Sequence, residues 1–232
     1  MEEQDKLTAE QTVQLTKEFL ERLGRPSEYR LRKKKDGGQF VIVVGGAPGS
    51  GKTTVAQEFA FSTRTFHIQS NSARQVLREY GLKWGENVHR LIEAVLRALL
   101  VQGYSVTLDG MISEGEEREL IRKIAGEYHA KAFFVAVVCA PSTAEARARK
   151  RYRYGRSLPS TFNDWRASPD KVEEYIDSIK TRSELLVKNL QEIPDDLNEP
   201  GVLRITNEHN EADLGRWSRQ VIVAVAWIFK HL

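Results

Sequence analysis

The sequence predicts an α/β protein in which a parallel β-sheet is covered by helices on both faces. Strand-like apolar runs alternate along the chain with amphipathic helical stretches, the pattern of a parallel sheet. The run 132–139 is apolar throughout, which is typical of a strand buried on both faces. Residues 46–53 match G-x-x-x-x-G-K-[ST] between a predicted strand and a predicted helix. In such folds, ligands bind at the carboxyl ends of the strands.

The first predicted element is a helix that begins after Thr8, a residue suited to capping, and ends before Gly24-Arg25-Pro26. A basic segment at 30–35 then leads into the first strand, and we expect it to be a connector. We divide the chain into three regions. Residues 1–38 form the N-terminal helix and connector, residues 39–210 form the core, and residues 211–232 form a C-terminal helix packed on the core.

The core contains five predicted strands, each identified by its apolar or β-branched composition. They lie at 39–45, 65–69, 104–109, 132–139 and 202–206. One of residues 70–72 is expected to cap a helix that continues through Tyr80. Further helices are predicted at 85–102, 114–128, 142–154, 168–190 and 211–230.

Composition limits the class of protein. The chain has 232 residues, of which 41% are hydrophobic and 29% charged, as in ordinary globular proteins. Its single cysteine, Cys139, lies in an apolar run, so we expect a buried thiol and a reducing compartment. The polar N-terminus is unlike a signal peptide, and the longest apolar run, 221–229, is too short to span a bilayer. We therefore expect a cytoplasmic protein that does not enter the membrane.

The glycine-rich segment predicts a site for the phosphates of a nucleoside triphosphate. Glycines let successive N–H groups point at an anion, and the following helix adds its positive N-terminal end. Lys52 would reach the β- and γ-phosphates, and the Thr53 hydroxyl would hold Mg²⁺. The predicted nucleotide-binding residues are Gly46, Pro48, Gly49, Ser50, Gly51, Lys52, Thr53 and Thr54.

Asp109 ends the third predicted strand, directly before a glycine. An acid at this edge of the sheet can hold the metal or take a proton from an attacking hydroxyl. We therefore predict Asp109 to be a catalytic and metal-binding residue; the alternative is a solvated aspartate at a strand end.

The helix 142–154 is rich in arginine, and with the loop that follows it forms a predicted lid at about 142–168. Arg147 and Arg151 lie four residues apart and share one face. Turned toward a triphosphate, they would neutralise charge on the transferred phosphoryl group, so we predict both to be catalytic and Arg151 also to bind the nucleotide. The alternative is a solvated helix surface.

The chain has five histidines, His67, His89, His129, His209 and His231. They are scattered, and none pairs with cysteine or acid at metal-ligand spacing, so all are interpreted as structural.

The chain resembles the small P-loop kinases that include bacteriophage-type polynucleotide kinases, zeta toxins, gluconate kinases and 2-phosphoglycerate kinases. The resemblance depends on the segments 45–54, 108–110 and 146–151. It implies a three-layer P-loop NTPase fold with a five-stranded parallel sheet in the order 2-3-1-4-5 and an arginine-rich lid. It also implies ATP and Mg²⁺ as cofactors, and it places Thr206 and Asn207 near the adenine.

One departure from the family pattern concerns the acceptor side. Many of these kinases carry Asp-x-x-Arg after the second strand, with the aspartate as general base; here the segment is Asn71-Ser72-Ala73-Arg74. Asn71 cannot take a proton but can orient a hydroxyl, and Arg74 would bind an anionic group of the acceptor or lie on the surface. Either Asp109 acts as the base or the reaction needs little base assistance. The predicted substrate-binding residues are Asn71, Arg74 and Asp109.

Two functions follow as hypotheses. The first is an ATP-dependent kinase that transfers the γ-phosphoryl group to a hydroxyl of a small molecule or a nucleic acid end. The net charge of +3 favours the small molecule. The second is a nucleotide-dependent regulatory ATPase that acts on a protein or RNA partner, which the missing acid at Asn71 favours.

Overall fold

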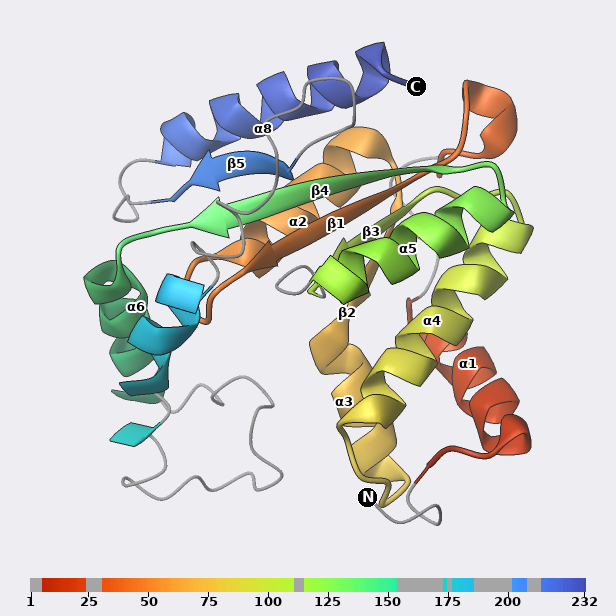
Figure 1. Cartoon of the computed structure of the whole chain (residues 1–232), viewed down its shortest axis with the longest axis horizontal. Helices are drawn as coiled ribbons and strands as arrows, with labels where there is room; N and C mark the ends of the chain where they lie inside the picture. Colours follow the sequence, from red (N-terminus) through yellow and green to blue (C-terminus); the bar gives the residue numbers. More distant parts are fainter. Residues whose placement is uncertain are drawn as a thin grey trace.

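The computed structural model describes residues 6–23, 31–110, 115–153, 173–174, 177–185, 202–207 and 214–232, with the backbone alone for residues 36, 151–153, 202 and 214–217. Its centre is a five-stranded sheet in which every pair of neighbouring strands is parallel. The order β2-β3-β1-β4-β5 confirms the prediction (Figure 1). The strands are β1 (Phe40–Gly46), β2 (Phe66–Gln69), β3 (Val106–Asp109), β4 (Lys131–Val138) and β5 (Val202–Thr206).

The helices lie where the sequence predicts them, with ends displaced by a few residues. They are α1 (Ala9–Leu23), α2 (Lys52–Thr63), α3 (Ser70–Glu79), α4 (Glu86–Val101), α5 (Gly115–Glu127), α6 (Pro141–Arg153) and α8 (Leu214–Lys230), with a short 3₁₀ turn at Lys34–Asp36. Residues 177–185 of the predicted helix 168–190 are also helical. The expected cap at residues 70–72 is wrong, because α3 already begins at Ser70 and these residues form its first turn.

The sheet separates two hydrophobic cores. Alternate residues of β1 point to opposite faces, so Val41 and Val43 enter one core while Ile42 and Val44 enter the other. Helices α1, α3, α4 and α5 contribute to the first core, and α2 and α8 contribute to the second (Figure 1). Because both faces are covered, β1 up to Gly45 and the middle of β4 are buried, which explains their continuous apolar sequences.

Helix α1 begins with a reciprocal cap. The N–H of Gln11 donates to Oγ1 of Thr8 at 3.1 Å, and the N–H of Thr8 donates to Oε1 of Gln11 at 2.9 Å. This pairing satisfies two N–H groups that the first turn would otherwise leave free, and it confirms Thr8 as the cap. Leu15 and Phe19 on the inner face of α1 are each 1% exposed, so the helix is an integral part of the first core.

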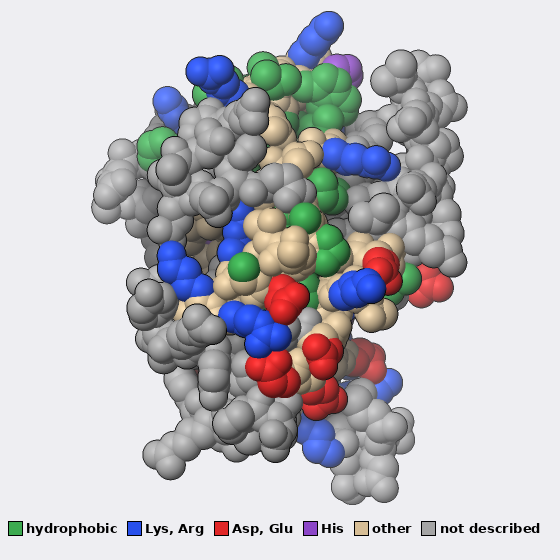
Figure 2. Space-filling model, turned by 90° about the vertical axis from the view of Figure 1, so that its left-hand side faces the viewer, with side chains coloured by type: hydrophobic (Ala, Val, Ile, Leu, Met, Phe, Trp, Pro, Cys, Tyr) green, Lys and Arg blue, Asp and Glu red, His purple; other side chains and the backbone are tan. Residues whose placement is uncertain are grey.

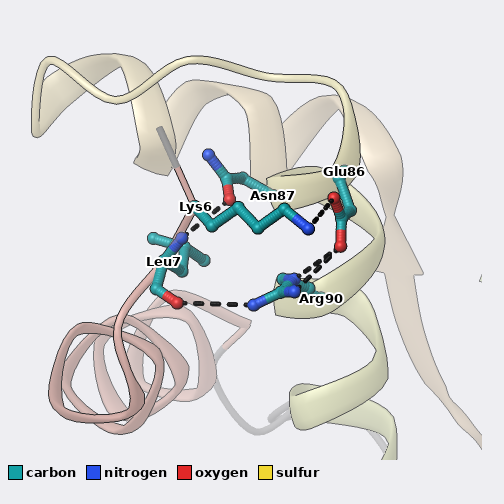
Figure 3. Close-up of polar contacts among 5 residues, drawn as sticks. All are labelled: Lys6, Leu7, Glu86, Asn87 and Arg90. Carbon is teal, nitrogen blue, oxygen red and sulfur yellow. Dashed lines mark hydrogen bonds and ion pairs between the residues drawn. The ribbon is translucent and has the colours of Figure 1, made fainter. Parts of the chain in front are cut away.

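The segment before α1 is tied to α4 by polar contacts (Figure 3). The N–H of Leu7 donates to Oδ1 of Asn87 at 2.9 Å, and Nδ2 of Asn87 donates to the carbonyl of Lys83 at 2.9 Å. At the surface, Lys6 and Arg90 both form ion pairs with Glu86, at 3.3 and 2.9 Å. The buried amide of Asn87 therefore holds the N-terminal segment against α4, while the ion pairs lie at the surface around this contact.

Helix α8 accounts for the apolar run near the end of the chain. Its Val221, Ala224 and Ile228 are buried in the second core beside α2 and β5. Within the part of the chain that the structure describes, no helix has the length and apolar character needed to cross a membrane.

Candidate nucleotide and metal site

The phosphate loop connects β1 to α2 and is held in a tight turn. The N–H of Ser50 donates to the carbonyl of Ala47 at 3.1 Å, and the φ angles of Gly49 and Gly51 are +81° and +86°. Side chains are strained at such angles. A Cβ at Gly49 would also lie 2.5 Å from the carbonyl oxygen of Ala144 in α6, so this glycine lets α6 pack directly on the loop.

Helix α2 presents its first turn to the loop. Gly51 precedes the helix without a side-chain cap, and Lys52 and Thr53 are its first two residues. N–H groups at an uncapped helix start are donors for an anion, and the helix dipole favours negative charge there. The loop, Lys52 and the helix start together provide the positive surroundings that a phosphate group requires.

Thr53 and Asp109 meet at the carboxyl edge of the sheet. Oγ1 of Thr53 donates to Oδ2 of Asp109 at 2.6 Å, and Asp109 is 5% exposed. The backbone around Asp109 is fixed as well, because Ser70 donates its hydroxyl to the Asp109 carbonyl at 2.8 Å and Gly110 donates its N–H to Val44 at 2.9 Å. The hydroxyl and the carboxylate are thus held side by side from two different elements.

This pair fits a magnesium ion by its chemistry. A threonine hydroxyl and a carboxylate are hard oxygen donors, which Mg²⁺ prefers, and proteins commonly bind Mg²⁺ through one or two such groups together with substrate phosphates. Among the described residues, no group of three or more His, Cys, Asp or Glu side chains is arranged to hold a metal alone. Thr53 and Asp109 therefore suit a metal that arrives with a nucleotide.

The side chain of Arg147 binds backbone carbonyls of the phosphate loop. Its guanidinium donates to the carbonyls of Gly49 and Ser50 at 3.2 and 3.3 Å, and to the backbone and side-chain oxygens of Asn207 at 3.2 and 3.3 Å. Arg147 thus joins the loop to α6 and to the end of β5. Its predicted catalytic role stays a prediction, and the side chain of Arg151 lies outside the described residues.

Arg149, two residues after Arg147 on α6, pairs with acidic side chains. It donates to Glu145 at 3.0 Å and to Glu173 at 2.8 Å, so it belongs to an ion-pair network at the surface of α6. Glu173, 24 residues away, could not be recognised as a partner from spacing along one helix.

Asn207 lies directly after β5 and beside the loop. Its Nδ2 donates to the carbonyl of Ser50 at 2.8 Å, and its N–H donates to the carbonyl of Val138 at 2.8 Å. Thr206 is exposed, and its N–H donates to Oε1 of Gln220 at 2.9 Å. The contact of these two residues with a nucleobase stays a prediction.

Asn71 and Arg74 lie together on the first turns of α3. Nη1 of Arg74 donates to Oδ1 of Asn71 at 3.3 Å, and the Arg74 guanidinium lies 5.8 Å from the centre of the Trp84 ring. Ser70 at the start of α3 is hydrogen-bonded to Asp109. Asn71 and Arg74 therefore lie next to Asp109 at the carboxyl edge of the sheet.

Figure 2 faces the carboxyl edge of the sheet. Among the described side chains, lysine and arginine are scattered over this face and acidic residues lie between them. The described side chains of this face therefore include separate basic groups, each of which could meet an individual anionic group.

The sequence does not predict two neighbours of Asp109, Ser70 and His67. Ser70 bonds to the Asp109 carbonyl in place of capping a helix, and His67 lies within the electrostatic influence of Asp109. Burial lowers the pKa of His67 from its ordinary 6.5, and the negative charge of Asp109 acts in the opposite direction. Only the pairing of β2 with β3 brings these residues together, and that pairing is a tertiary feature.

Residues 41–174, more than half of the chain, match the family AAA_33, which is described as an AAA domain. The chain belongs to AAA_33. The match includes the phosphate loop, Asp109 and the lid helix, and it agrees with the resemblance to small P-loop kinases.

Curated relatives match over a shorter stretch. The uncharacterized protein Rv2004c of Mycobacterium tuberculosis and an uncharacterized protein of Mycobacterium bovis are each 32% identical over 104 residues, covering 38% of this chain and 21% of the relative. The chain thus spans about a fifth of the length of the curated relatives it matches.

Solved structures show the same fold as this AAA_33 chain. A "putative kinase" from Chloroflexus aurantiacus superposes with a TM-score of 0.58 at 17% identity, covering 84% of this chain and 99% of that one. A structure from the PezAT toxin–antitoxin system of Streptococcus pneumoniae gives a TM-score of 0.59 at 13% identity, covering 98% and 96%. The chain therefore shares its fold with these two structures.

Proposed function

We propose that the chain is an ATP-dependent kinase that transfers the γ-phosphoryl group to a hydroxyl of a small acceptor carrying an anionic group. The observation that carries this proposal is the Thr53–Asp109 pair, 2.6 Å apart, beside a glycine-rich loop at the carboxyl edge of a kinase-like sheet. Phosphoryl transfer depends mostly on positioning and charge stabilisation, and this edge supplies both.

Each residue has a role in the proposed reaction. Lys52 and the N–H groups at the start of α2 bind the β- and γ-phosphates. Thr53 and Asp109 would hold Mg²⁺, which when bound would neutralise charge on the phosphate oxygens. Arg147 keeps the loop in its binding shape through the carbonyls of Gly49 and Ser50.

The acceptor side of the proposed site is α3. Arg74 binds the anionic group of the acceptor. Asn71, whose Oδ1 accepts from Nη1 of Arg74 at 3.3 Å, orients the hydroxyl of the acceptor. The acceptor oxygen bonds to the γ-phosphorus as the bond from that phosphorus to the β,γ-bridging oxygen breaks and ADP leaves, and the hydroxyl proton passes to water as the new bond is completed. A loose transition state does not require early removal of the hydroxyl proton, so an asparagine suffices at position 71.

The test is transfer of radiolabelled γ-phosphate from ATP to a panel of small phosphorylated and carboxylated alcohols, with oligonucleotides as a second panel. Transfer to a small anionic acceptor, lost in Lys52→Ala with the melting temperature retained, is the expected result. Transfer that persists in Lys52→Ala overturns the proposal.

A second candidate function is a nucleotide-dependent regulatory ATPase acting on a protein or RNA partner. The exposed Asn71, which offers no carboxylate to an acceptor, is the observation that favours it. Tight ATP binding without transfer to any member of either panel would support this function over the kinase.

A further inference from the structure

A histidine and a glutamine share the sheet face that carries Asp109. In the parallel pair β2–β3, His67 lies opposite Thr107, and Gln69 lies opposite Asp109. Side chains at paired positions point to the same side of the sheet. The alternate residues of both strands enter the first core, on the opposite face: Phe66, Ile68, Val106 and Leu108. The side chains of His67, Gln69 and Asp109 therefore lie together on the α2 side.

Two buried polar atoms on this face have no hydrogen-bond partner among the described residues. They are Nε2 of His67 and Oδ1 of Asp109. Buried polar atoms in native proteins are almost always paired, either directly or through ordered water. The two residues are on neighbouring strands and two positions apart, so their Cα atoms are separated by roughly 8 Å. The charge of Asp109 acts on the His67 ring, and one ordered water can bridge two polar groups that are too far apart to bond directly.

The contact with Gln69 bears on which nitrogen of His67 carries the proton. Nε2 of Gln69 lies 3.3 Å from Nδ1 of His67. With the Gln69 amide in this orientation, its nitrogen donates and Nδ1 accepts, which leaves the hydrogen of the neutral ring on Nε2. Burial keeps the ring neutral by lowering its pKa below 6.5. The unpaired atom of His67 is thus a donor, and the unpaired oxygen of Asp109 is an acceptor.

We propose that His67 is a positioning residue for Asp109, with its Nε2–H group donating to a single buried water that in turn donates to Oδ1. The carboxylate is then held from both sides, because Thr53 already donates to Oδ2. This role rests on the proposed function in one respect, namely that Asp109 holds the metal. Partners behind a metal-binding carboxylate fix its orientation and commonly change metal affinity by about 10- to 100-fold.

The tautomer and the bridge can be tested without catalysis. In the ¹⁵N-labelled full chain, long-range ¹H–¹⁵N correlation spectra identify His67 by the signals lost in His67→Gln. The expected result is a neutral Nε2–H tautomer whose proton exchanges slowly with water, and this protection should be lost in Asp109→Ala. A Nδ1–H tautomer, or protection unchanged in Asp109→Ala, overturns the proposal.

The effect on the metal is measured by calorimetric titration of ADP binding at increasing Mg²⁺. His67→Asn, whose shorter amide falls short of the bridge, should raise the half-saturating Mg²⁺ concentration by about tenfold. His67→Gln, which carries an N–H at nearly the same reach, should stay close to wild type. His89→Gln, at an exposed position of α4, is the matched control. Equal Mg²⁺ dependence in His67→Asn and wild type overturns the proposal.

The two proposals fail in different ways. If Asp109→Ala leaves the Mg²⁺ dependence unchanged, the metal role of Asp109 in the proposed function is wrong, while the tautomer and exchange results still decide whether His67 is bonded to Asp109. If Asp109→Ala abolishes the Mg²⁺ effect and His67→Asn does not alter it, only the role of His67 is wrong.

Discussion

Oγ1 of Thr53 lies 2.6 Å from Oδ2 of Asp109, which joins the first turn of α2 to the end of β3 across 56 positions of sequence. The contact brings a hydroxyl, a carboxylate and the start of a helix to one point. It is the arrangement from which the proposed metal and phosphate chemistry follows.

Replacing Thr53 tests this contact directly. Thr53→Ala removes one of the two oxygen donors, so ADP should still bind while the gain in affinity on adding Mg²⁺ falls by about 10-fold or more. Calorimetric titration with and without Mg²⁺ measures both quantities. Thr53→Ser retains the hydroxyl and is the matched control. An unchanged Mg²⁺ effect in Thr53→Ala would show that the metal is held elsewhere.

Restoring an acid at position 71 tests the acceptor side. Asn71→Asp supplies a general base next to the acceptor hydroxyl, and general bases typically contribute about 10²- to 10⁴-fold to a rate. We therefore expect kcat to rise in Asn71→Asp and to fall in Asn71→Ala, which can no longer orient the hydroxyl. Steady-state phosphoryl transfer measures both. A rate in Asn71→Ala equal to that of wild type would remove Asn71 from the site.

Two arginines on α6 offer a matched comparison. Arg147 binds the carbonyls of the phosphate loop, whereas Arg149 pairs with Glu145 and Glu173 at the surface. Arg147→Ala should weaken ATP binding by about tenfold, equivalent to the roughly 1.4 kcal/mol of one charge-assisted hydrogen bond. Arg149→Ala should change it little, because exposed ion pairs contribute about 0–1 kcal/mol. Equal losses in the two variants would indicate a general effect of charge on the lid.

The anchor of the N-terminal segment is expected to affect stability without affecting the nucleotide site. Asn87 is fully buried, and Asn87→Ala leaves the Leu7 N–H and the Lys83 carbonyl without their partner. The free energy of unfolding should fall by about 1–3 kcal/mol. Lys6→Ala, which removes only an exposed ion pair, is the control (Figure 3). Denaturant unfolding measures both, and an Asn87→Ala protein as stable as the control would contradict the expectation.

The fold could be predicted because its signals are local or repeated. The apolar runs of β1 and β4, the glycine-rich turn and the cap at Thr8 each depend on neighbouring residues, and alternation of strands and helices leaves few arrangements for a parallel sheet. The strand order came from the resemblance to small P-loop kinases and not from these signals.

The candidate site was predictable only in part, for a physical reason. Lys52, Thr53 and Asp109 stand at fixed places relative to a strand end. The charge that acts on His67, the loop carbonyls bound by Arg147 and the Glu173 partner of Arg149 all come from other elements. The register of β2 against β3 places His67 on the same face as Asp109 and two positions away, and periodicity within one strand carries no information about that register.

The packing of α8 has a consequence for synthesis of the chain on the ribosome. The five strands and α2 are all translated before α8. The side chains of α8 that complete the second core, Val221, Ala224 and Ile228, are therefore the last part of this core to be synthesised. Until then, large apolar side chains such as Phe40, Phe59 and Phe133 have an incomplete core, a condition that favours aggregation and chaperone binding. Nascent chains arrested before α8 should therefore be cut by protease in β1 and α2 and become resistant once α8 has emerged; equal resistance at both lengths would show that this face closes without its last helix.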